Sequence, residues 1–232
     1  MGIDFADPGN RRTYAARTAD REWAGFVGVD GSAAMVSGAR ERAASPGRAR
    51  GSRAGGGALR FVVADAADTG LTAGAFDAVL QRALIHHVAD LRAVFAEARR
   101  ILRPGGSLIV QDRTMADVAR PGSPEHPRGY FFERYPRLLE VERARRPRAE
   151  GLQAALAEAG FDVVRQHALA EVRREYASVD ELAGDLRSRT GRSILHELDD
   201  AELADLVDFV ASKYPDAARP RETDHWTVWT AR

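Results

Sequence analysis

The sequence predicts an α/β fold: a doubly wound, mostly parallel sheet with helices on both faces and an antiparallel C-terminal strand. Three short apolar runs, at residues 61–64, 76–80 and 107–110, are too brief for helices and rich in β-branched or aromatic residues, which is typical of buried strands. Apolar residues recur at helical spacing over residues 91–102, between the second and third runs. A strand, a helix and a strand in this order predict a right-handed crossover with parallel strands.

The ends of these elements are marked by particular residues. The predicted helix stops at residues 104–106, Pro-Gly-Gly, because proline cannot continue a helix and glycine supplies the turn. Asp65 and Gln81 fall at the carboxyl ends of the first two strands. Open α/β sheets bind their ligands at this edge, so we expect a ligand site there.

The N-terminal part adds a polar helix, predicted for residues 11–23, and a short strand at residues 26–29 that ends at Asp30. Ser32 can cap the helix that follows. The expected buried face of that helix consists of Met35, Val36, Ala39 and Ala43. Residues 45–57 are rich in Gly, Arg, Ser and Pro, and we expect a mobile loop rather than an RNA contact because no aromatic residue is interleaved for base stacking.

The C-terminal half contains an aromatic cluster at residues 130–135, which either lines a substrate cavity or packs an extra helix. Packing is the favoured interpretation. A basic run at residues 143–148 is interpreted as a solvated helix face rather than a nucleic-acid site. Further helices are predicted at 151–159, 179–189, 193–198 and 200–214, and extended segments at 161–176 and 225–230.

Composition excludes several classes of function. The chain has 232 residues, balanced acidic and basic side chains, and no cysteine. Zero net charge argues against a basic nucleic-acid surface or a polybasic membrane anchor, and the lack of cysteine excludes disulfides, thiolate metal sites and a cysteine nucleophile. No apolar run approaches the roughly 18 residues of a membrane span, and residues 1–10 lack the regions of a secretory signal. We therefore expect a soluble cytoplasmic protein without a membrane or nucleic-acid partner.

Four motifs follow one another in a characteristic order. They are VGVDGSAAM at residues 27–35, ADA at 64–66, FDAVLQ at 76–81 with LIHHV at 84–88, and ILRPGG at 101–106. In this order the chain resembles the class I S-adenosylmethionine-dependent methyltransferases, in particular the small-molecule branch of the methyltransferase type 11 kind. The resemblance implies a Rossmann-like methyltransferase fold, S-adenosylmethionine as cofactor and a small-molecule methyl acceptor.

The resemblance also implies an adenosine site. Asp30, followed by Gly31, would accept hydrogen bonds from both ribose hydroxyls, and Asp65 would accept one from the adenine amino group. Ala66 would donate its backbone N–H to the adenine ring, and Met35 would cover one face of it. The competing interpretation makes the two aspartates helix caps or turn residues and Met35 a core residue.

The methyl-transfer side is implied at the end of the next strand. Gln81 and Arg82 would lie close to the transferred methyl group. His86 and His87 are candidates for a general base, although a histidine pair that opens a helix is more often structural. Metal binding by the pair is not expected, since no carboxylate at suitable spacing completes a site.

The sequence departs from the family before Asp30. Family members carry a first strand and a glycine-rich GxGxG loop there, and neither is found among the 29 residues that precede Asp30. Gly25, Gly28 and Gly31 do not restore the loop, because they lie within and just after a strand. The missing strand normally lies between the second and fourth family strands, so we expect residues 27–30 to pair directly with residues 76–80.

Four segments are expected. They are an N-terminal helical segment at residues 1–26, a methyltransferase-like core at 27–177, a helical lid at 178–214 and a C-terminal strand at 215–232 that completes the core.

The favoured function is methyl transfer from S-adenosylmethionine to a small-molecule oxygen, nitrogen or carbon nucleophile. Catalysis would come chiefly from positioning and from exclusion of water, because a sulfonium is already a good leaving group. Two alternatives stay open: a degenerate, non-catalytic binding protein of the same fold, and an NAD-dependent dehydrogenase, in which Asp30 would also bind a ribose.

Overall fold

The computed structural model describes residues 25–44 and 58–232. The predicted helix at residues 11–23 and the predicted loop at residues 45–57 lie outside the described residues. The chain divides into two compact units, and we treat each by itself. The first unit comprises Met1–Gly70 with Arg189–Ser193, and the second comprises Leu71–Ser188 with Ile194–Arg232.

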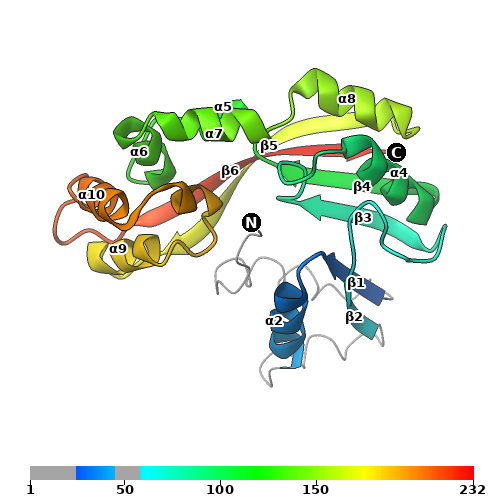
Figure 1. Cartoon of the computed structure of the whole chain (residues 1–232), viewed down its shortest axis with the longest axis horizontal. Helices are drawn as coiled ribbons and strands as arrows, with labels where there is room; N and C mark the ends of the chain where they lie inside the picture. Colours follow the sequence, from blue (N-terminus) through cyan, green and yellow to red (C-terminus); the bar gives the residue numbers. More distant parts are fainter. Residues whose placement is uncertain (1–24, 45–57) are drawn as a thin grey trace. The chain divides into compact units, whose positions relative to one another are not determined.

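The first unit contains a parallel βαβ arrangement (Figure 1). Strand β1 (Gly25–Asp30) leads into helix α2 (Ala33–Ala44), and strand β2 (Ala58–Val63) pairs with β1 in register. The Ser32 hydroxyl accepts a hydrogen bond from the Met35 N–H at 3.4 Å, which confirms the predicted cap. A Cβ atom at Gly28 would come within 2.7 Å of the Phe61 ring, so this ring occupies the space that a side chain at position 28 would need.

The second unit is built on a four-stranded mixed sheet of order β3-β4-β6-β5. These strands are β3 (Phe76–Arg82), β4 (Leu102–Asp112), β5 (Val163–Glu175) and β6 (Arg221–Ala231). Helix α4 (Leu91–Ile101) connects β3 to the parallel strand β4, and β6 is antiparallel to both of its neighbours. The predicted crossover and the predicted antiparallel C-terminal strand are therefore confirmed.

The end of α4 differs from the prediction. The helix stops at Ile101, before the Pro-Gly-Gly sequence, and β4 already begins at Leu102. Phe76 pairs with Leu102 while Ala78 pairs with Ser107, so the residues between these pairs bulge out of the ladder. Proline disfavours helical backbone in the residue before it, and Gly105 takes a positive φ of 77° in the bulge.

The expected pairing of residues 27–30 with residues 76–80 stays a prediction, because the two segments belong to different compact units. Strand β1 pairs with β2 in a two-stranded sheet, whereas β3 belongs to the four-stranded sheet. Apolar periodicity identifies strands but carries little information about which edges pair. In the described part of the chain, β4 is the one strand that is hydrogen-bonded to β3.

Helices of the second unit gather at both ends of its sheet (Figure 1). Helix α4 packs against α8 (Ala149–Glu158), and Gly160, with φ of 78°, ends α8 as predicted. At the other end, β5 and β6 continue as a two-stranded ribbon beyond the last β4 pair, between Asp112 and Thr227. The remaining helical elements are α5 (Met115–Val118), α6 (Pro127–Arg134), α7 (Arg137–Arg145), α9 (Val179–Arg187), η1 (Ser193–Glu197) and α10 (Asp200–Ala211).

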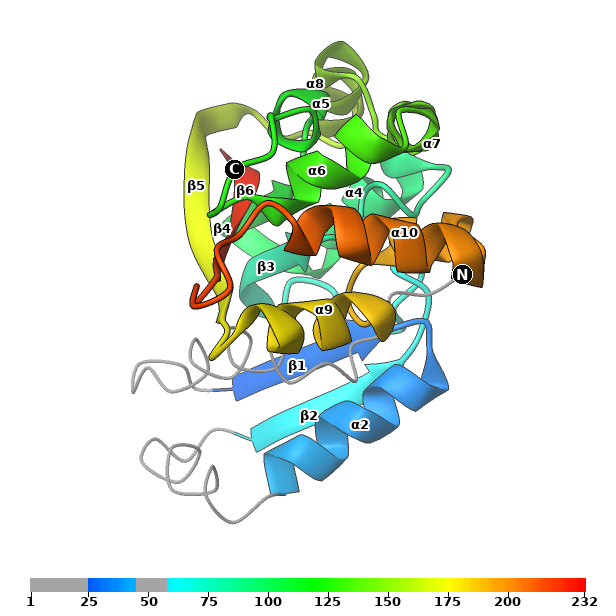
Figure 2. The same ribbon diagram turned by 90° about the vertical axis from the view of Figure 1, so that its left-hand side faces the viewer.

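A hydrophobic core joins α6, α9 and α10, which lie together in Figure 2. Phe131, Leu186 and Leu206 are fully buried in it, and Tyr135 packs against its rim. The aromatic cluster at residues 130–135 thus packs a helix, as the favoured interpretation stated.

The predicted segment boundaries stay predictions. None of the helices in the described residues is both long and apolar enough to cross a membrane.

Candidate functional site

The two aspartates predicted for adenosine binding both lie in tight turns at strand ends. Asp30 is the last residue of β1, and its Oδ1 accepts the Ser32 N–H at 2.7 Å. Asp65 lies two residues beyond β2, and its Oδ1 accepts the Ala67 N–H at 2.8 Å. The turn interpretation is therefore correct for one oxygen of each carboxylate. Within the described residues, the Oδ2 atom of each makes no hydrogen bond and is free to accept one from a ligand.

The parallel pairing of β1 and β2 brings these turns to the same edge. Asp30 is opposite Val63, and the Ala64 N–H donates to the Asp30 carbonyl oxygen at 3.1 Å. Three further predicted residues lie in the same unit: Gly31 is exposed, whereas Met35 and Ala66 are half-buried. All five predicted adenosine residues are thus in one compact unit.

The remaining predicted residues belong to the second unit. Arg82 forms an ion pair with Glu171 at 2.6 Å, and its guanidinium lies 5.0 Å from the centre of the Trp226 ring. The Arg82 side chain is therefore engaged by its own sheet. Gln81 is 7% exposed, and its Oε1 atom has no hydrogen-bond partner among the described residues. A buried carboxamide oxygen without a donor is costly, and a ligand at this strand end would satisfy it.

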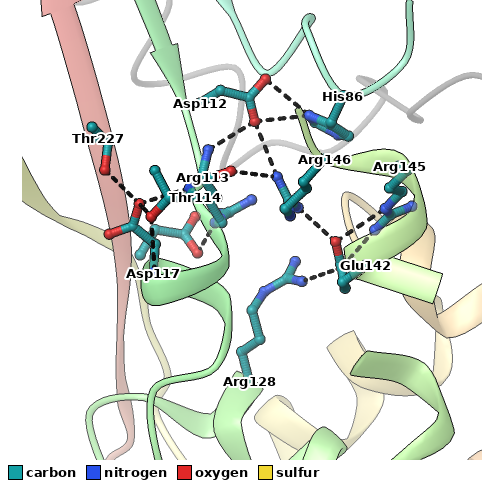
Figure 3. A network of polar contacts seen from close by, with 11 residues as sticks. His86, Asp112, Arg113, Thr114, Asp117, Arg128, Glu142, Arg145, Arg146 and Thr227 are labelled. Carbon is teal, nitrogen blue, oxygen red and sulfur yellow. Dashed lines mark hydrogen bonds and ion pairs between the residues drawn. The ribbon is translucent and has the colours of Figure 1, made fainter. Parts of the chain in front are cut away.

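His86 lies in the loop between β3 and α4, so the expectation that the histidine pair opens a helix is wrong. Its Nδ1 atom lies 2.8 and 2.9 Å from the two carboxylate oxygens of Asp112, the last residue of β4 (Figure 3). Because its partner is a carboxylate, Nδ1 carries the proton and Nε2 holds the lone pair. Nε2 makes no hydrogen bond within the described chain and is not fully buried, so it can accept a proton.

The electrostatics of this pair favour a neutral histidine beside an ionised carboxylate. Burial lowers the pKa of His86 below its usual 6.5, against the opposing hydrogen bond and charge of Asp112. Burial alone would raise the pKa of Asp112, but the His86 hydrogen bond and the Arg146 charge hold it below its ordinary value. At neutral pH the pair is therefore a free imidazole base oriented by an anion, which is the arrangement of a general base.

His87 has a different environment. The centre of its ring lies 4.0 Å from the centre of the His86 ring, and its side chain makes no hydrogen bond within the described residues. Burial, followed by the charge of His86, lowers the pKa of His87 to about 4. Since no carboxylate orients the ring, His87 is the poorer candidate for a base.

Arg146 connects Asp112 to helix α7. Its Nη1 donates to Asp112 Oδ1 at 3.2 Å and to the Arg113 carbonyl at 2.9 Å, and its Nη2 lies 2.7 Å from Glu142 Oε2. Arg145 also donates to Glu142. The interpretation of residues 143–148 as a solvated face is wrong for Arg145 and Arg146, which turn inward to these carboxylates. The residues that hold His86 were not identified from the sequence. Asp112 lies two residues beyond the strand predicted at residues 107–110, so the rule that identified Asp65 at a strand end could have found it.

Asp112 is further fixed by the turn that follows it. The Arg113 N–H donates to Asp112 Oδ1 at 2.8 Å. Thr114 and Asp117 then form a capping box at α5, and Asp117 Oδ2 accepts from the Thr227 hydroxyl at 2.6 Å. Among the residues that the structure describes, no cluster of three or more potential metal ligands occurs.

Comparison with known proteins gives a family match and a fold. Residues 7–110 match the model of a methyltransferase domain family. The uncharacterised protein YafE of Escherichia coli strain K12 is 48% identical over 50 residues, which span 22% of this chain and 22% of that relative.

Solved structures match over most of the chain. The [4+2]-cyclase SpnF is similar with a TM-score of 0.53 at 22% identity, covering 94% of this chain and 70% of that one. A protein from Methanosarcina mazei, described as a S-adenosylmethionine-dependent methyltransferase, gives a TM-score of 0.51 at 14% identity, covering 95% and 85% of the two chains. At these identities the likeness shows the fold.

Proposed function

Since residues 7–110 carry a methyltransferase domain and the chain has the fold of class I S-adenosylmethionine-dependent methyltransferases, we propose that it transfers a methyl group from S-adenosylmethionine to a hydroxyl group of a small molecule. The observation that carries the choice of a hydroxyl is the buried pair of His86 and Asp112 at the carboxyl ends of β3 and β4. A hydroxyl is a weak nucleophile until its proton is removed, whereas a neutral amine needs no base to attack.

The residues of the first unit fit the adenosine half of this cofactor. Each of Asp30 and Asp65 uses one carboxylate oxygen in its own turn and keeps the other free of hydrogen bonds in the described chain. Asp30 would hold the ribose hydroxyls, and Asp65 the adenine amino group, with the Ala66 N–H and the Met35 side chain against the ring. Ribose hydroxyls and an exocyclic amine are donors, which is the chemistry that free carboxylate oxygens bind.

The second unit supplies the proton transfer. When bound, S-adenosylmethionine provides an activated methyl group on a sulfonium. His86 Nε2 would accept the proton of the acceptor hydroxyl and so leave its oxygen as the nucleophile for that methyl group. Asp112 keeps the ring in the tautomer with Nε2 free and stabilises the imidazolium that forms, and Arg146 keeps Asp112 ionised.

The test compares His86→Gln with His196→Gln, a control in which an exposed histidine of η1 is changed. Transfer of a labelled methyl group from S-adenosylmethionine is measured with a panel of phenols and hydroxy acids, together with calorimetric binding of S-adenosylhomocysteine. Loss of a general base should lower kcat by roughly 10²–10⁴-fold in His86→Gln, with cofactor binding unchanged. Equal turnover in both variants would overturn the proposal.

A specific observation supports a second candidate. The similar structure of a [4+2]-cyclase indicates that this fold is not confined to methyl transfer. The alternative is therefore that this chain binds a ligand without catalysis, or that it catalyses a different reaction. Binding of S-adenosylmethionine without transfer to any acceptor in the panel would favour this alternative. Binding of neither S-adenosylmethionine nor S-adenosylhomocysteine at millimolar concentration would favour an inactive protein.

A further inference from the structure

Arg128, the second residue of α6, is a buried cation with little compensation. Its side chain is 7% exposed, and its one polar contact in the described chain joins Nη1 to Glu142 Oε1 at 3.4 Å. That is a long distance for a charge-assisted hydrogen bond, which is usually about 2.7–2.9 Å. Four of the five N–H donors of the guanidinium are therefore not used by the described protein.

Glu142 does not belong to Arg128 alone. The same carboxylate accepts from Arg145 at 2.6 and 3.0 Å and lies 2.7 Å from Arg146 (Figure 3). Arg113, the other guanidinium close enough to repel Arg128, has its own partner in Asp224 at 2.7 Å. The carboxylates around Arg128 are thus closer to other arginines than to Arg128.

Burial without a close counter-charge makes the charged form of Arg128 unfavourable. Burial and the neighbouring Arg113 lower the pKa of Arg128 to about 9, although Glu142 and Asp224 act in the opposite direction. The group is still positive at neutral pH. Its Nε and Nη2 atoms make no hydrogen bond in the described chain, and neither atom is completely shielded from solvent.

We propose that Arg128 binds an oxyanion group, a carboxylate or a phosphate, carried by the methyl acceptor. The fork of a guanidinium matches the paired oxygens of these groups, and a ligand anion would supply the counter-charge that Glu142 does not. Arg128 is linked to the base through Glu142, Arg146 and Asp112, so the anion site and His86 belong to one network.

The identity of the acceptor rests on the proposed function, whereas anion binding by Arg128 does not. The competing role for Arg128 is structural, since the ion pair with Glu142 joins α6 to α7. A structural role predicts that anions affect the wild-type chain and an Arg128 variant equally. An anion site predicts a saturable response that requires Arg128.

The test uses the full chain without cofactor, in chloride buffer at constant ionic strength. Inorganic phosphate in one series and acetate in another are titrated while binding is followed by calorimetry and by the shift in Tm. The variants are Arg128→Gln, Arg128→Lys and the control Arg134→Gln, which removes an exposed arginine of the same helix that pairs with Asp205. The anion that binds more tightly, phosphate or acetate, indicates whether the acceptor's oxyanion group is a phosphate or a carboxylate.

We expect saturable binding in the wild-type chain and in Arg134→Gln, loss of that binding in Arg128→Gln, and roughly tenfold weaker binding in Arg128→Lys, which keeps the charge but not the fork. An equal response of the wild-type chain and Arg128→Gln, or no saturable response of the wild-type chain to either anion, would overturn the anion site. If Arg128→Gln fails to fold, the same decision is made between the wild-type chain and Arg128→Lys. Anion binding without methyl transfer would overturn the proposed function alone.

Discussion

The two units position their polar groups by different means. In the first unit, Asp30 and Asp65 are held by hydrogen bonds to backbone N–H groups two residues away, and Val36 is the one buried hydrophobic side chain in the described residues 25–44 and 58–70. In the second unit, Asp112 is buried and held by His86 and Arg146 from other parts of the chain. Glu142 is buried and pairs with Arg145 and Arg146 at the end of its own helix, and with Arg128 of α6. Local turns therefore set the proposed cofactor carboxylates, and tertiary packing sets the proposed base.

The largest effect is expected at Glu142. Glu142→Gln would leave three guanidiniums without their shared counter-charge, two of them on buried side chains, and should lower the free energy of unfolding by about 3–5 kcal/mol in urea denaturation. The matched change Asp65→Asn keeps a turn-forming oxygen and should cost less than about 0.5 kcal/mol. An equal loss of unfolding free energy in Glu142→Gln and Asp65→Asn would contradict the proposed difference between the two units.

The same residue predicts a pH dependence. The charges of Arg146 and its neighbours lower the pKa of Glu142 from 4.5 to about 2, although burial acts against them. A lowered acid pKa contributes stability above the unfolded value and loses it as pH falls, so the wild-type chain should lose about 3 kcal/mol between roughly pH 5 and pH 2 through this group. The loss from this group should be absent in Glu142→Gln, as measured by urea denaturation at each pH.

Asp30→Ala should have its effect on binding rather than on packing. Loss of hydrogen bonds to the ribose hydroxyls should weaken S-adenosylhomocysteine binding by about 2–3 kcal/mol, which is roughly 30–150-fold in Kd by calorimetry. The cost in unfolding free energy should stay near or below about 1 kcal/mol, because a turn is lost and no core contact. Unchanged binding would show that the ribose assignment is wrong.

Two glycine substitutions give the smallest expected effects and opposite signs. Gly28→Ala would place a Cβ atom 2.7 Å from the Phe61 ring and should destabilise the first unit by about 1–3 kcal/mol. Gly151→Ala lies in α8, where a Cβ meets nothing within 4 Å, and should stabilise the second unit by about 0.5–1 kcal/mol. Thermal unfolding of both variants checks the signs, and a stabilised Gly28→Ala would contradict the close packing of the Phe61 ring over Gly28.

Much of the fold follows from local sequence signals. Short apolar runs located the strands, helical periodicity located α4 and α10, and Ser32 and Gly160 marked helix ends. These signals depend on residues close in sequence, so they are readable without a structure. The pairing of β1 with β2 and the bulge after α4 depend on which edges meet, which periodicity does not encode.

The proposed catalytic site could be predicted only in part, because its residues are far apart in the sequence. His86 was recognisable as a candidate, but its partner Asp112 is 26 residues away and Arg146 is 34 residues beyond Asp112. From the sequence alone, an arginine in a basic run is interpreted as solvated, because the buried carboxylate with which it pairs is not known. Contacts of this kind come from the parallel ends of β3 and β4 and the packing of α7, and neither has a local signature.

The central claim, that His86 is the general base, is tested most directly by the pH dependence of kcat/KM for an accepted hydroxyl compound. His86 faces Asp112, His87, Arg145 and Arg146, and their combined effect with burial lowers its pKa. Because the base must be neutral, kcat/KM should rise with pH through an inflection below pH 6.5 and then level off. That inflection should disappear in His86→Gln. An inflection that persists in His86→Gln, or a rate that falls as pH rises through this range, would contradict the account.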